Sequence, residues 1–429
     1  MPNCAHTHLA FEPSAHAAEA GFVRASPAKL SAAAQPNGKP LKSTSTRTGY
    51  QDVGNTSTFP QPLVLPGDDL ALDPDYEPQT LKSWIEEPER NEVTKIRRTI
   101  YVAEVPSISP SCPEVASWSQ PNIAKPKAGP RDQTDIPKPK CSDVRSYLKA
   151  FYHPLPTKTL PKSKSLEFVP WTDDPETYIG LKLGSSQEVI GIRHRPSLDG
   201  IFSGQLNLDD LLDAAITLLP KDAYALLLLV DHDLYEDEED DFCCGRAYGG
   251  SRVAVVSSAR YNPNLDEMVG LEREHAWPAS HFEAYIDRCL GKKRVRGKTW
   301  IKNPLQDAVD AFNSSPPIIT PLGLSNLWLS RVCKTASHEL GHCFGMDHCV
   351  FYSCIMQGTA GLEEDSRQPP YLCPVDLKKV LHAVGARNGG RERCEELRKF
   401  CEVWGEKEGG GMWRAWGKWL EGRVGELEE

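Results

Sequence analysis

The chain has 429 residues, of which 39% are apolar and 25% charged, with a formal net charge of −10 and a pI of about 5.7. This acidic balance argues against nucleic acid as a partner, because neutralising phosphates requires a basic face. The longest apolar run, Tyr224 to Val230, is far shorter than the ~20 residues that a membrane-spanning helix needs, so no membrane partner is expected.

The N-terminal residues and the cysteines both bear on the compartment. The first 26 residues contain no long apolar core and carry Glu12 and Glu19, which disfavours a secretion signal. The chain has 13 cysteines, an odd count that favours free thiols and metal ligands over a disulfide framework. We therefore expect a protein of the cytoplasm or nucleus that is not secreted.

The composition predicts one catalytic domain with long flanks, although the length alone allows two or three domains. The 35 prolines are concentrated before residue 161, which is typical of extended or disordered chain. We predict four regions: a disordered segment 1–75, a Pro-rich and partly ordered extension 76–140, a catalytic domain 141–388 and a helical tail 389–429. Within the extension, Thr99 to Val105 could form a strand.

The predicted domain begins with a short amphipathic helix near Cys141 that ends before Pro154. The turn residues that follow separate three predicted strands, Leu166–Trp171, Tyr178–Leu183 and Glu188–Arg193. The clearest helix of this part, Asn207–Leu219, stops at Pro220 and leads into the apolar run 224–230. A continuous apolar strand after a helix predicts a buried central strand in an α/β-type layer.

Three further segments have charge or strand patterns. The acidic run 235–241 could hold a hard cation or attract basic peptides, but a solvated loop is the simpler interpretation. Residues 252–259 form a predicted strand, placed at a sheet edge because glycine and serine precede it. The basic segment 291–298 is expected to be a surface loop.

The helix of greatest interest follows Pro321, with Ser325 as its predicted N-cap. On this helix His338 and His342 are four residues apart, so both imidazoles leave the same face one turn apart. In the tail, two helical patterns are split by the glycines at 409–411, and the second carries a stripe of Trp413, Trp416 and Leu420 that is expected to pack on the protein or a partner.

The stretch from His338 to His348 reads HELGHCFGMDH and predicts a catalytic zinc site. Gly345 can end the helix and reverse the chain, so that His348 reaches the metal as a third ligand. Three neutral imidazoles leave the fourth position of the zinc open for water, whose pKa falls toward ~7 when bound. Glu339 would act as the general base of a peptide hydrolysis.

The same stretch resembles the long H-E-x-x-H-x-x-G-x-x-H motif of the metzincins, and Met356 falls where that clan has its Met-turn. Cys349, Cys354 and Cys373 further resemble the archaemetzincin family. The resemblance implies an α+β fold, with a metzincin-like zincin catalytic domain that has a mixed twisted sheet, an active-site helix and a small lower subdomain. It also implies a zinc peptidase, aminopeptidase-like in some members, whose peptide substrate pairs with the edge strand predicted at 252–259.

The family also has a second, structural zinc held by four cysteines. Cys349, Cys354 and Cys373 match three of its ligands, whereas the fourth position here is Asp376. A carboxylate can bind zinc at about 2.0–2.2 Å, although it is harder than a thiolate, so a Cys₃Asp site is chemically allowed and expected to be weaker. The alternative is that these cysteines are buried, reduced thiols without metal.

Two functions remain open from the sequence. The first is a zinc metallopeptidase that acts on peptide or protein substrates. The second is a zinc-stabilised binding protein with little or no peptidase activity, against which the intact Glu339 argues, since binding needs no general base. Peptide specificity, endo- or exopeptidase action and oligomeric state are not decided by the sequence.

Overall fold

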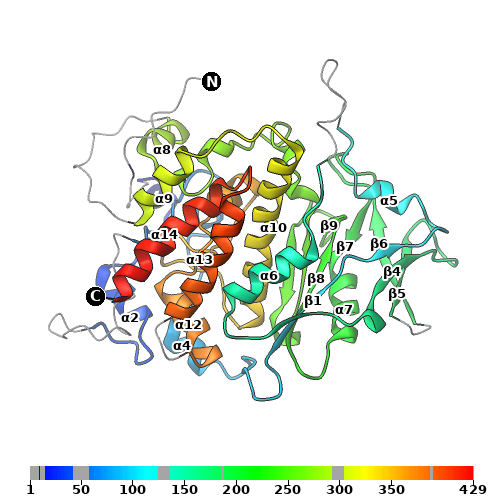
Figure 1. The fold of residues 1–429 in the computed structure, drawn as a ribbon, viewed down its shortest axis with the longest axis horizontal. Helices are drawn as coiled ribbons and strands as arrows, with labels where there is room; N and C mark the ends of the chain where they lie inside the picture. Colours follow the sequence, from blue (N-terminus) through cyan, green and yellow to red (C-terminus); the bar gives the residue numbers. More distant parts are fainter. Residues whose placement is uncertain are drawn as a thin grey trace. The chain divides into compact units, whose positions relative to one another are not determined.

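The computed structural model describes residues 9, 15–41, 58–123, 136–184, 188–291, 304–386 and 390–428 (Figure 1). All but the first residue of the predicted basic loop 291–298 lies outside these residues. By its internal packing the chain divides into two compact units. We call residues 89–265 and 319–345 the sheet unit, and residues 1–88, 266–318 and 346–429 the helical unit. Among the described helices, none combines the length and apolarity that a membrane crossing requires.

The sheet unit is built on a five-stranded sheet with the order β10-β11-β8-β1-β3. Its strands are β1 (Thr99–Ala103), β3 (Thr157–Thr159), β8 (Ala223–Val230), β10 (Gly245–Tyr248) and β11 (Val253–Ser257). Neighbouring strands are parallel except β10, which pairs antiparallel with β11. The sheet is therefore mixed, and β8 is the buried central strand that its apolar run predicts.

Helices cover both faces of this sheet. Helix α7 (Leu208–Leu218) packs its leucines against Leu226, Leu228 and Val255, which share one face because side chains alternate along a strand. Helix α10 (Pro321–Cys343) packs against β10 and β11 outside that cluster, and α6 (Cys141–Phe151) packs on α10 (Figure 1). A strand covered on both faces has to be apolar throughout, which explains the composition of β8.

A second sheet of the same unit has the order β2-β4-β5-β6-β7-β9. Its strands are β2 (Ser107–Ile108), β4 (Leu166–Val169), β5 (Tyr178–Leu183), β6 (Val189–Arg195), β7 (Gln205–Asn207) and β9 (Asp233–Tyr235). The three strands predicted between residues 166 and 193 are thus confirmed with small shifts of their ends. The unit also contains α5 (Val115–Trp118) and the short 3-10 helices η2 (Lys162–Lys164), η3 (Gly249–Ser251), η4 (Ala259–Tyr261) and η5 (Pro263–Leu265).

Two strands of the sheet unit differ from the sequence-based expectation. The strand predicted at 252–259 is confirmed as β11, but its predicted edge position is wrong, because β11 lies between β10 and β8 and β10 is the edge on that side. Four residues of mixed polarity, Gly245 to Tyr248, have no periodicity that could have predicted β10. The strand predicted at 99–105 forms β1, which is fully buried between β8 and β3 rather than an accessory of the domain.

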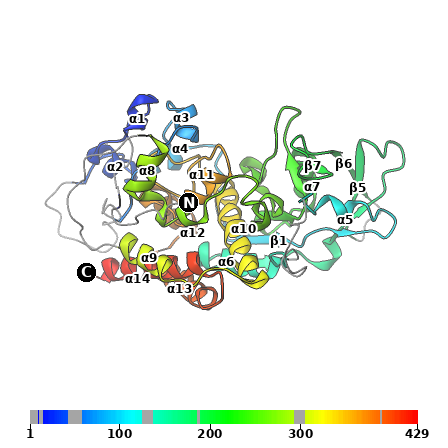
Figure 2. The ribbon, with the colours of Figure 1, turned by 90° about the horizontal axis from the view of Figure 1, so that it is seen from above.

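The helical unit consists of helices joined by long loops. These are α1 (His16–Glu19), α2 (Pro27–Ala33), α3 (Asp69–Leu72), α4 (Leu81–Glu86), η6 (Arg273–His275), η7 (Ala279–His281), α8 (Glu283–Cys289), α9 (Pro304–Asn313), α11 (Leu362–Arg367), α12 (Pro374–Val384), α13 (Arg391–Gly405) and α14 (Gly411–Glu428). The two predicted tail helices, α13 and α14, pack on each other and α14 packs on α9 (Figures 1 and 2). Trp413, Trp416 and Leu420 are buried there, so the stripe packs back on the protein.

The N-terminal segment differs from the predicted disordered region 1–75 wherever the structure describes it. Residues 15–41 and 58–75 contain α1, α2 and α3, and Ala17, Phe22, Val64 and Leu70 form an apolar cluster with Val350. Such a segment has no helical or strand period because its apolar residues are sparse and each is buried by distant chain. The predicted boundaries at 75, 140 and 388 also do not coincide with the two units, each of which joins separate stretches.

Candidate metal centres

Helix α10 carries the first two histidines, and it starts one turn earlier than predicted. Thr320 is its N-cap, with the side-chain oxygen accepting a hydrogen bond of 3.1 Å from the backbone N–H of Gly323, and Pro321 occupies the first turn. The predicted N-cap, Ser325, lies inside the helix. Proline has no N–H to lose at this position, so Thr-Pro is the stronger start signal.

His338 and His342, which we call the histidine pair, point their ring nitrogens toward one point. Their Nε2 atoms lie 3.0 Å apart and both side chains are half-buried. Two nitrogens that bind one tetrahedral zinc at about 2.0–2.1 Å lie roughly 3.3 Å apart, so the pair fits a zinc ion. The helical spacing read from the sequence is confirmed, and the donor type matches that metal.

Glu339 leaves α10 beside the edge strand of the sheet. A methyl group at Gly245 of β10 would lie 3.3 Å from Cγ of Glu339. Burial raises the pKa of the Glu339 carboxyl to about 8, while the Arg246 charge acts in the opposite direction. A carboxyl with a pKa near neutrality can both accept and return a proton, as a general base and acid must.

Tyrosines from α6 and the residues just after it hold α10 in place. The hydroxyl of Tyr152 donates a hydrogen bond of 2.5 Å to the backbone carbonyl of Ser337, and the hydroxyls of Tyr147 and Ser337 lie 3.1 Å apart. On another side of the helix, Trp328 donates from Nε1 to the carbonyl of Ser258 at 2.7 Å. The two tyrosine contacts fix Ser337, the residue that precedes His338, and the sequence pattern did not predict them.

The end of α10 turns as the motif predicts. Gly345 has a φ of +73°, in the left-handed region that glycine adopts without strain. A side chain there would also meet Arg90, whose Cγ lies 2.9 Å from the position of a methyl group. Beside the turn, Phe344 stacks on Tyr152 with ring centroids 4.9 Å apart.

His348, the predicted third ligand, belongs to the helical unit. Its ring lies 5.8 Å from that of Tyr76 and next to Asp69 and Gly358. Burial lowers the pKa of His348, while the carboxylates of Asp69 and Asp347 act in the opposite direction. Sequence reasoning missed Asp69 and Tyr76, because they come from chain without a recognisable pattern.

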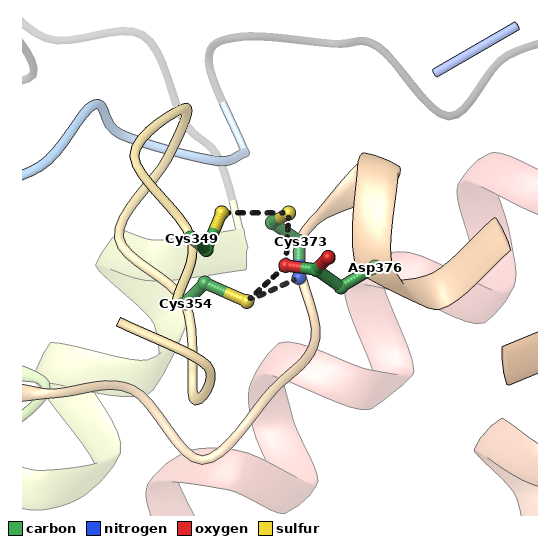
Figure 3. Close-up of side chains that lie close together, drawn as sticks. All are labelled: Cys349, Cys354, Cys373 and Asp376. Carbon is green, nitrogen blue, oxygen red and sulfur yellow. Dashed lines mark hydrogen bonds between the residues drawn. The ribbon is translucent and has the colours of Figure 1, made fainter. Parts of the chain in front are cut away.

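Four further donors meet in the helical unit and are drawn in Figure 3. We call Cys349, Cys354, Cys373 and Asp376 the cysteine cluster. Two come from the loop after α10, Cys373 caps α12, and Asp376 lies in the first turn of α12. All four side chains are buried, and their donor atoms lie within 4.8 Å of one another. The pattern read from the sequence thus becomes one compact group.

The distances within the cysteine cluster fit a metal better than a disulfide. The sulfurs of Cys349 and Cys373 are 3.6 Å apart, and Oδ2 of Asp376 lies 3.3 Å from the sulfurs of Cys354 and Cys373 (Figure 3). Donors bound to one zinc at about 2.3 Å for sulfur and 2.1 Å for oxygen are separated by roughly 3.6–3.8 Å in a tetrahedron. Although an aspartate replaces the fourth cysteine of the family pattern, Asp376 therefore still supplies a donor atom at the position of a fourth ligand.

A buried lysine accompanies this carboxylate. Nζ of Lys379 lies 2.9 Å from Oδ1 of Asp376, and the two side chains are only 2% and 1% exposed. Nζ also donates to Oε1 of Gln79 at 2.8 Å. Burial raises the pKa of Asp376 to about 6, Cys349 adds to the rise and Lys379 opposes it. Oδ1 of Asp376 therefore forms the ion pair with the lysine, whereas Oδ2 faces the sulfurs.

Met356, the predicted Met-turn residue, is fully buried in the helical unit. Its backbone carbonyl accepts a hydrogen bond of 2.7 Å from the N–H of Cys349. This bond ties the methionine to the loop that supplies the first cysteine ligand. The residue therefore orders this loop.

Comparison with known proteins finds relatives of one kind. Residues 316–382 match the model of Peptidase family M54. Archaemetzincin-2 of Macaca fascicularis is 32% identical over 181 residues, which cover 42% of this chain and 42% of the relative. Archaemetzincin-1 of Mus musculus is 30% identical over 227 residues, covering 50% of this chain and 38% of the relative. The chain thus matches less than half the length of these relatives.

Two solved structures show a weaker likeness. Archaemetzincin from Methanopyrus kandleri superposes with a TM-score of 0.32 at 15% identity, covering 68% of this chain and 97% of that one. A protein of Methanocorpusculum labreanum described as a zinc-dependent peptidase gives 0.30 at 16% identity, covering 66% and 99%. Such TM-scores do not establish a common arrangement of the whole chain.

Proposed function

Because the chain belongs to the archaemetzincin family, Peptidase family M54, we propose that it is a zinc-dependent metallopeptidase that hydrolyses peptide bonds. The observation that carries this proposal is the position of Glu339. It is buried on the helix that presents the histidine pair, and it lies against the edge strand of a mixed sheet. A binding protein needs no such carboxyl at that place.

His338, His342 and His348 would hold the catalytic zinc. The first two already converge with donor atoms suited to the metal, and the turn at Gly345 directs the chain onward to the third. Bound zinc supplies Lewis-acid chemistry, which polarises a carbonyl and makes hydroxide available near neutral pH. The imidazoles bind as neutral bases, so the metal affinity should rise with pH until they are deprotonated.

Glu339 would move the proton. Its carboxylate accepts a proton from the attacking water and then donates it to the nitrogen of the leaving amine. The carboxyl is held by the packing of β10 against α10, where Gly245 leaves just enough room for it. This position should raise the rate of hydrolysis, because proton transfer requires that the carboxylate lie within hydrogen-bond distance of the proton it accepts.

Strand β10 would bind the substrate. It is the edge of the sheet, and its outer backbone N–H and C=O groups can pair with an extended peptide. A peptide added there would run past Gly245, where Glu339 lies. We propose on this basis a metzincin-like catalytic domain in which the sheet unit supplies the substrate edge and the active-site helix, and the helical unit supplies the lower subdomain.

The cysteine cluster would hold a second, structural zinc. Its four donors form a closed set inside the protein, without the open position that chemistry requires. The metal would join the loop after α10 to the start of α12. We further propose a reducing compartment, cytosol or nucleus, because none of the 12 cysteines among the described residues is in a disulfide.

The test is hydrolysis of a panel of short peptides by zinc-loaded wild type and by Glu339→Ala. We expect the rate to fall by about 10²–10⁴-fold in the variant, with the zinc content unchanged. Glu114→Ala, an exposed glutamate of the same unit, serves as the matched control and should retain the wild-type rate. Hydrolysis that persists in Glu339→Ala would exclude the mechanism.

The same panel tests the finer proposal of aminopeptidase-like action. Peptides with an acetylated N-terminus should be cleaved slowly if the enzyme needs a free terminal amine, and equally fast if it cleaves internally. If the zinc-loaded wild type hydrolyses no peptide of the panel, the alternative function, a zinc-stabilised binding protein, replaces the peptidase.

A further inference from the structure

The one carboxylate of the cysteine cluster has different partners at its two oxygens. Oδ2 of Asp376 lies 3.3 Å from the sulfurs of Cys354 and Cys373 and therefore faces the space between the donor atoms (Figure 3). Oδ1 lies 2.9 Å from Nζ of Lys379, one turn further along α12. One oxygen is thus directed at the sulfurs, and the other is bound to a cation.

The lysine is itself held from a second side. Its Nζ donates a hydrogen bond of 2.8 Å to Oε1 of Gln79, and the same oxygen accepts a hydrogen bond of 3.2 Å from the backbone N–H of Asp347. The side chain of Lys379 is only 2% exposed. Burial and two oxygen partners therefore fix the ammonium group at the carboxylate.

This arrangement bears on how an aspartate can replace a cysteine as a ligand. A thiolate offers a metal one donor atom, whereas a carboxylate offers two and binds through one oxygen or through both. A structural zinc takes four ligand atoms, so a carboxylate that bound through both oxygens would exceed this number. A cation held on one oxygen competes with the metal for that oxygen, and the other oxygen is left as the donor.

The charges of the cluster favour the same arrangement. Three thiolates and one carboxylate carry more negative charge than one zinc ion neutralises, and all four side chains are buried. A buried charge is costly unless it is paired, so a cation next to the cluster lowers that cost. Lys379 supplies this cation through its ion pair with Asp376.

We propose that Lys379 is a positioning residue for the structural zinc: it binds Oδ1 of Asp376, so that the carboxylate binds the metal through Oδ2 alone. The inference rests on the proposed function, in which the cysteine cluster holds zinc. Asp376 and Lys379 then act as one unit that replaces the fourth cysteine of the family pattern. Because a contact outside the ligand set fixes the ligand, the loss of Lys379 changes both the coordination number and the affinity of the metal.

The test uses full-length protein in which cobalt(II) replaces zinc. The visible absorption of cobalt is strong with four ligand atoms and weak with more, and a thiolate-to-cobalt band in the near ultraviolet identifies the cysteine cluster. Wild type should show the strong bands of a four-coordinate site. Lys379→Met frees Oδ1, so the visible bands should weaken, and the zinc affinity of the cluster, measured by competition with a chelator, should fall by about 10–100-fold.

Lys378→Met is the matched control variant. It removes the neighbouring lysine of the same helix and should keep the spectrum and the affinity of the wild type. The double variant Asp376→Cys/Lys379→Met is the rescue, because a thiolate has one donor atom and needs no lysine to limit it. Four-coordinate bands and wild-type affinity in Lys379→Met alone would overturn the inference.

The wild-type spectrum covers the case in which Lys379→Met does not fold. Weak visible bands together with a thiolate-to-cobalt band would mean that the carboxylate binds through both oxygens although the lysine is present, and this result would also overturn the inference. Failure of the proposed structural site gives a different result. In that case cobalt produces no thiolate band in wild type, in the control or in the double variant.

Discussion

The histidine pair and the cysteine cluster bring their donor atoms together in different surroundings. The histidines come from one helix, are half-buried and have an acidic carboxyl between them in the sequence. The cysteine cluster comes from a loop and the start of α12, is fully buried and has a lysine bound to its one carboxylate. An open site of nitrogen donors suits chemistry, whereas a closed site of mostly sulfur donors suits structure.

Because the two sites differ in this way, the loss of a ligand should have different consequences in each of them. Loss of a histidine should remove activity and one zinc while the fold survives, because α10 is held by tyrosines and by the sheet. Loss of a cysteine should remove the connection between two segments of the helical unit and leave buried polar atoms unpaired. Three measurements sharpen or break this contrast.

The largest effect is expected for Cys373→Ser. The variant should lower the free energy of unfolding by about 4 kcal/mol or more, the size typical of a lost structural metal. His342→Ala, its counterpart in the other site, should change the unfolding free energy by only about 1 kcal/mol. Urea unfolding of both proteins checks this difference. Equal destabilisation by the two substitutions would show that the histidine site stabilises the fold as much as the cysteine cluster does.

The next effect concerns Lys379. Lys379→Met leaves the carboxylate of Asp376 buried without its partner, which should destabilise the zinc-free protein by about 3–5 kcal/mol. Zinc should offset part of this loss, since the metal also neutralises the carboxylate. Lys378→Met, at the neighbouring position, is the control. A Lys379→Met protein as stable as the control would show that the ion pair does not stabilise the cluster.

A smaller effect should appear at acid pH in both units. Burial lowers the pKa of His232 in the sheet unit and of His281 in the helical unit to about 4. A histidine whose folded pKa is depressed stabilises the fold above its ordinary pKa of about 6.5. That stability is lost as the pH falls from there toward 4, with a limit of about 3 kcal/mol for each group.

Unfolding by urea between pH 7 and pH 4 measures this loss, and His232→Asn isolates one contribution. The unfolding free energy of the variant should vary less with pH than that of the wild type, and the difference is the contribution of His232. An identical pH profile would mean that the ring is protonated within the folded protein. Because neither histidine belongs to a metal centre, the effect should be the same with and without zinc.

The sequence predicted best where one short stretch contains the whole pattern. The spacing of His338 and His342 and the turn at Gly345 follow from helix geometry and from the conformations open to glycine. The central strand 224–230 followed from its unbroken apolar composition. In each case the local rule and the final structure agree, so no distant residue had to be known.

Prediction failed where distant segments define the structure. Strand β10 is an edge only because β11 pairs with β8 on its other side, and four residues cannot reveal that. Asp69 and Tyr76 lie near His348 only in the folded protein, and His348 is far along the chain, so their position could not be predicted from the sequence. The N-terminal segment was expected to be disordered for the same reason: its few apolar residues find partners such as Val350 that no periodicity marks.

The zinc content of the purified protein tests the central claim most directly. Metal analysis of full-length wild type should give close to two zinc ions per chain, as one open and one closed site require. His342→Ala and Cys373→Ser should each give close to one. A wild-type content of one that Cys373→Ser leaves unchanged would remove the structural site. A content that His342→Ala leaves unchanged would contradict the catalytic zinc itself.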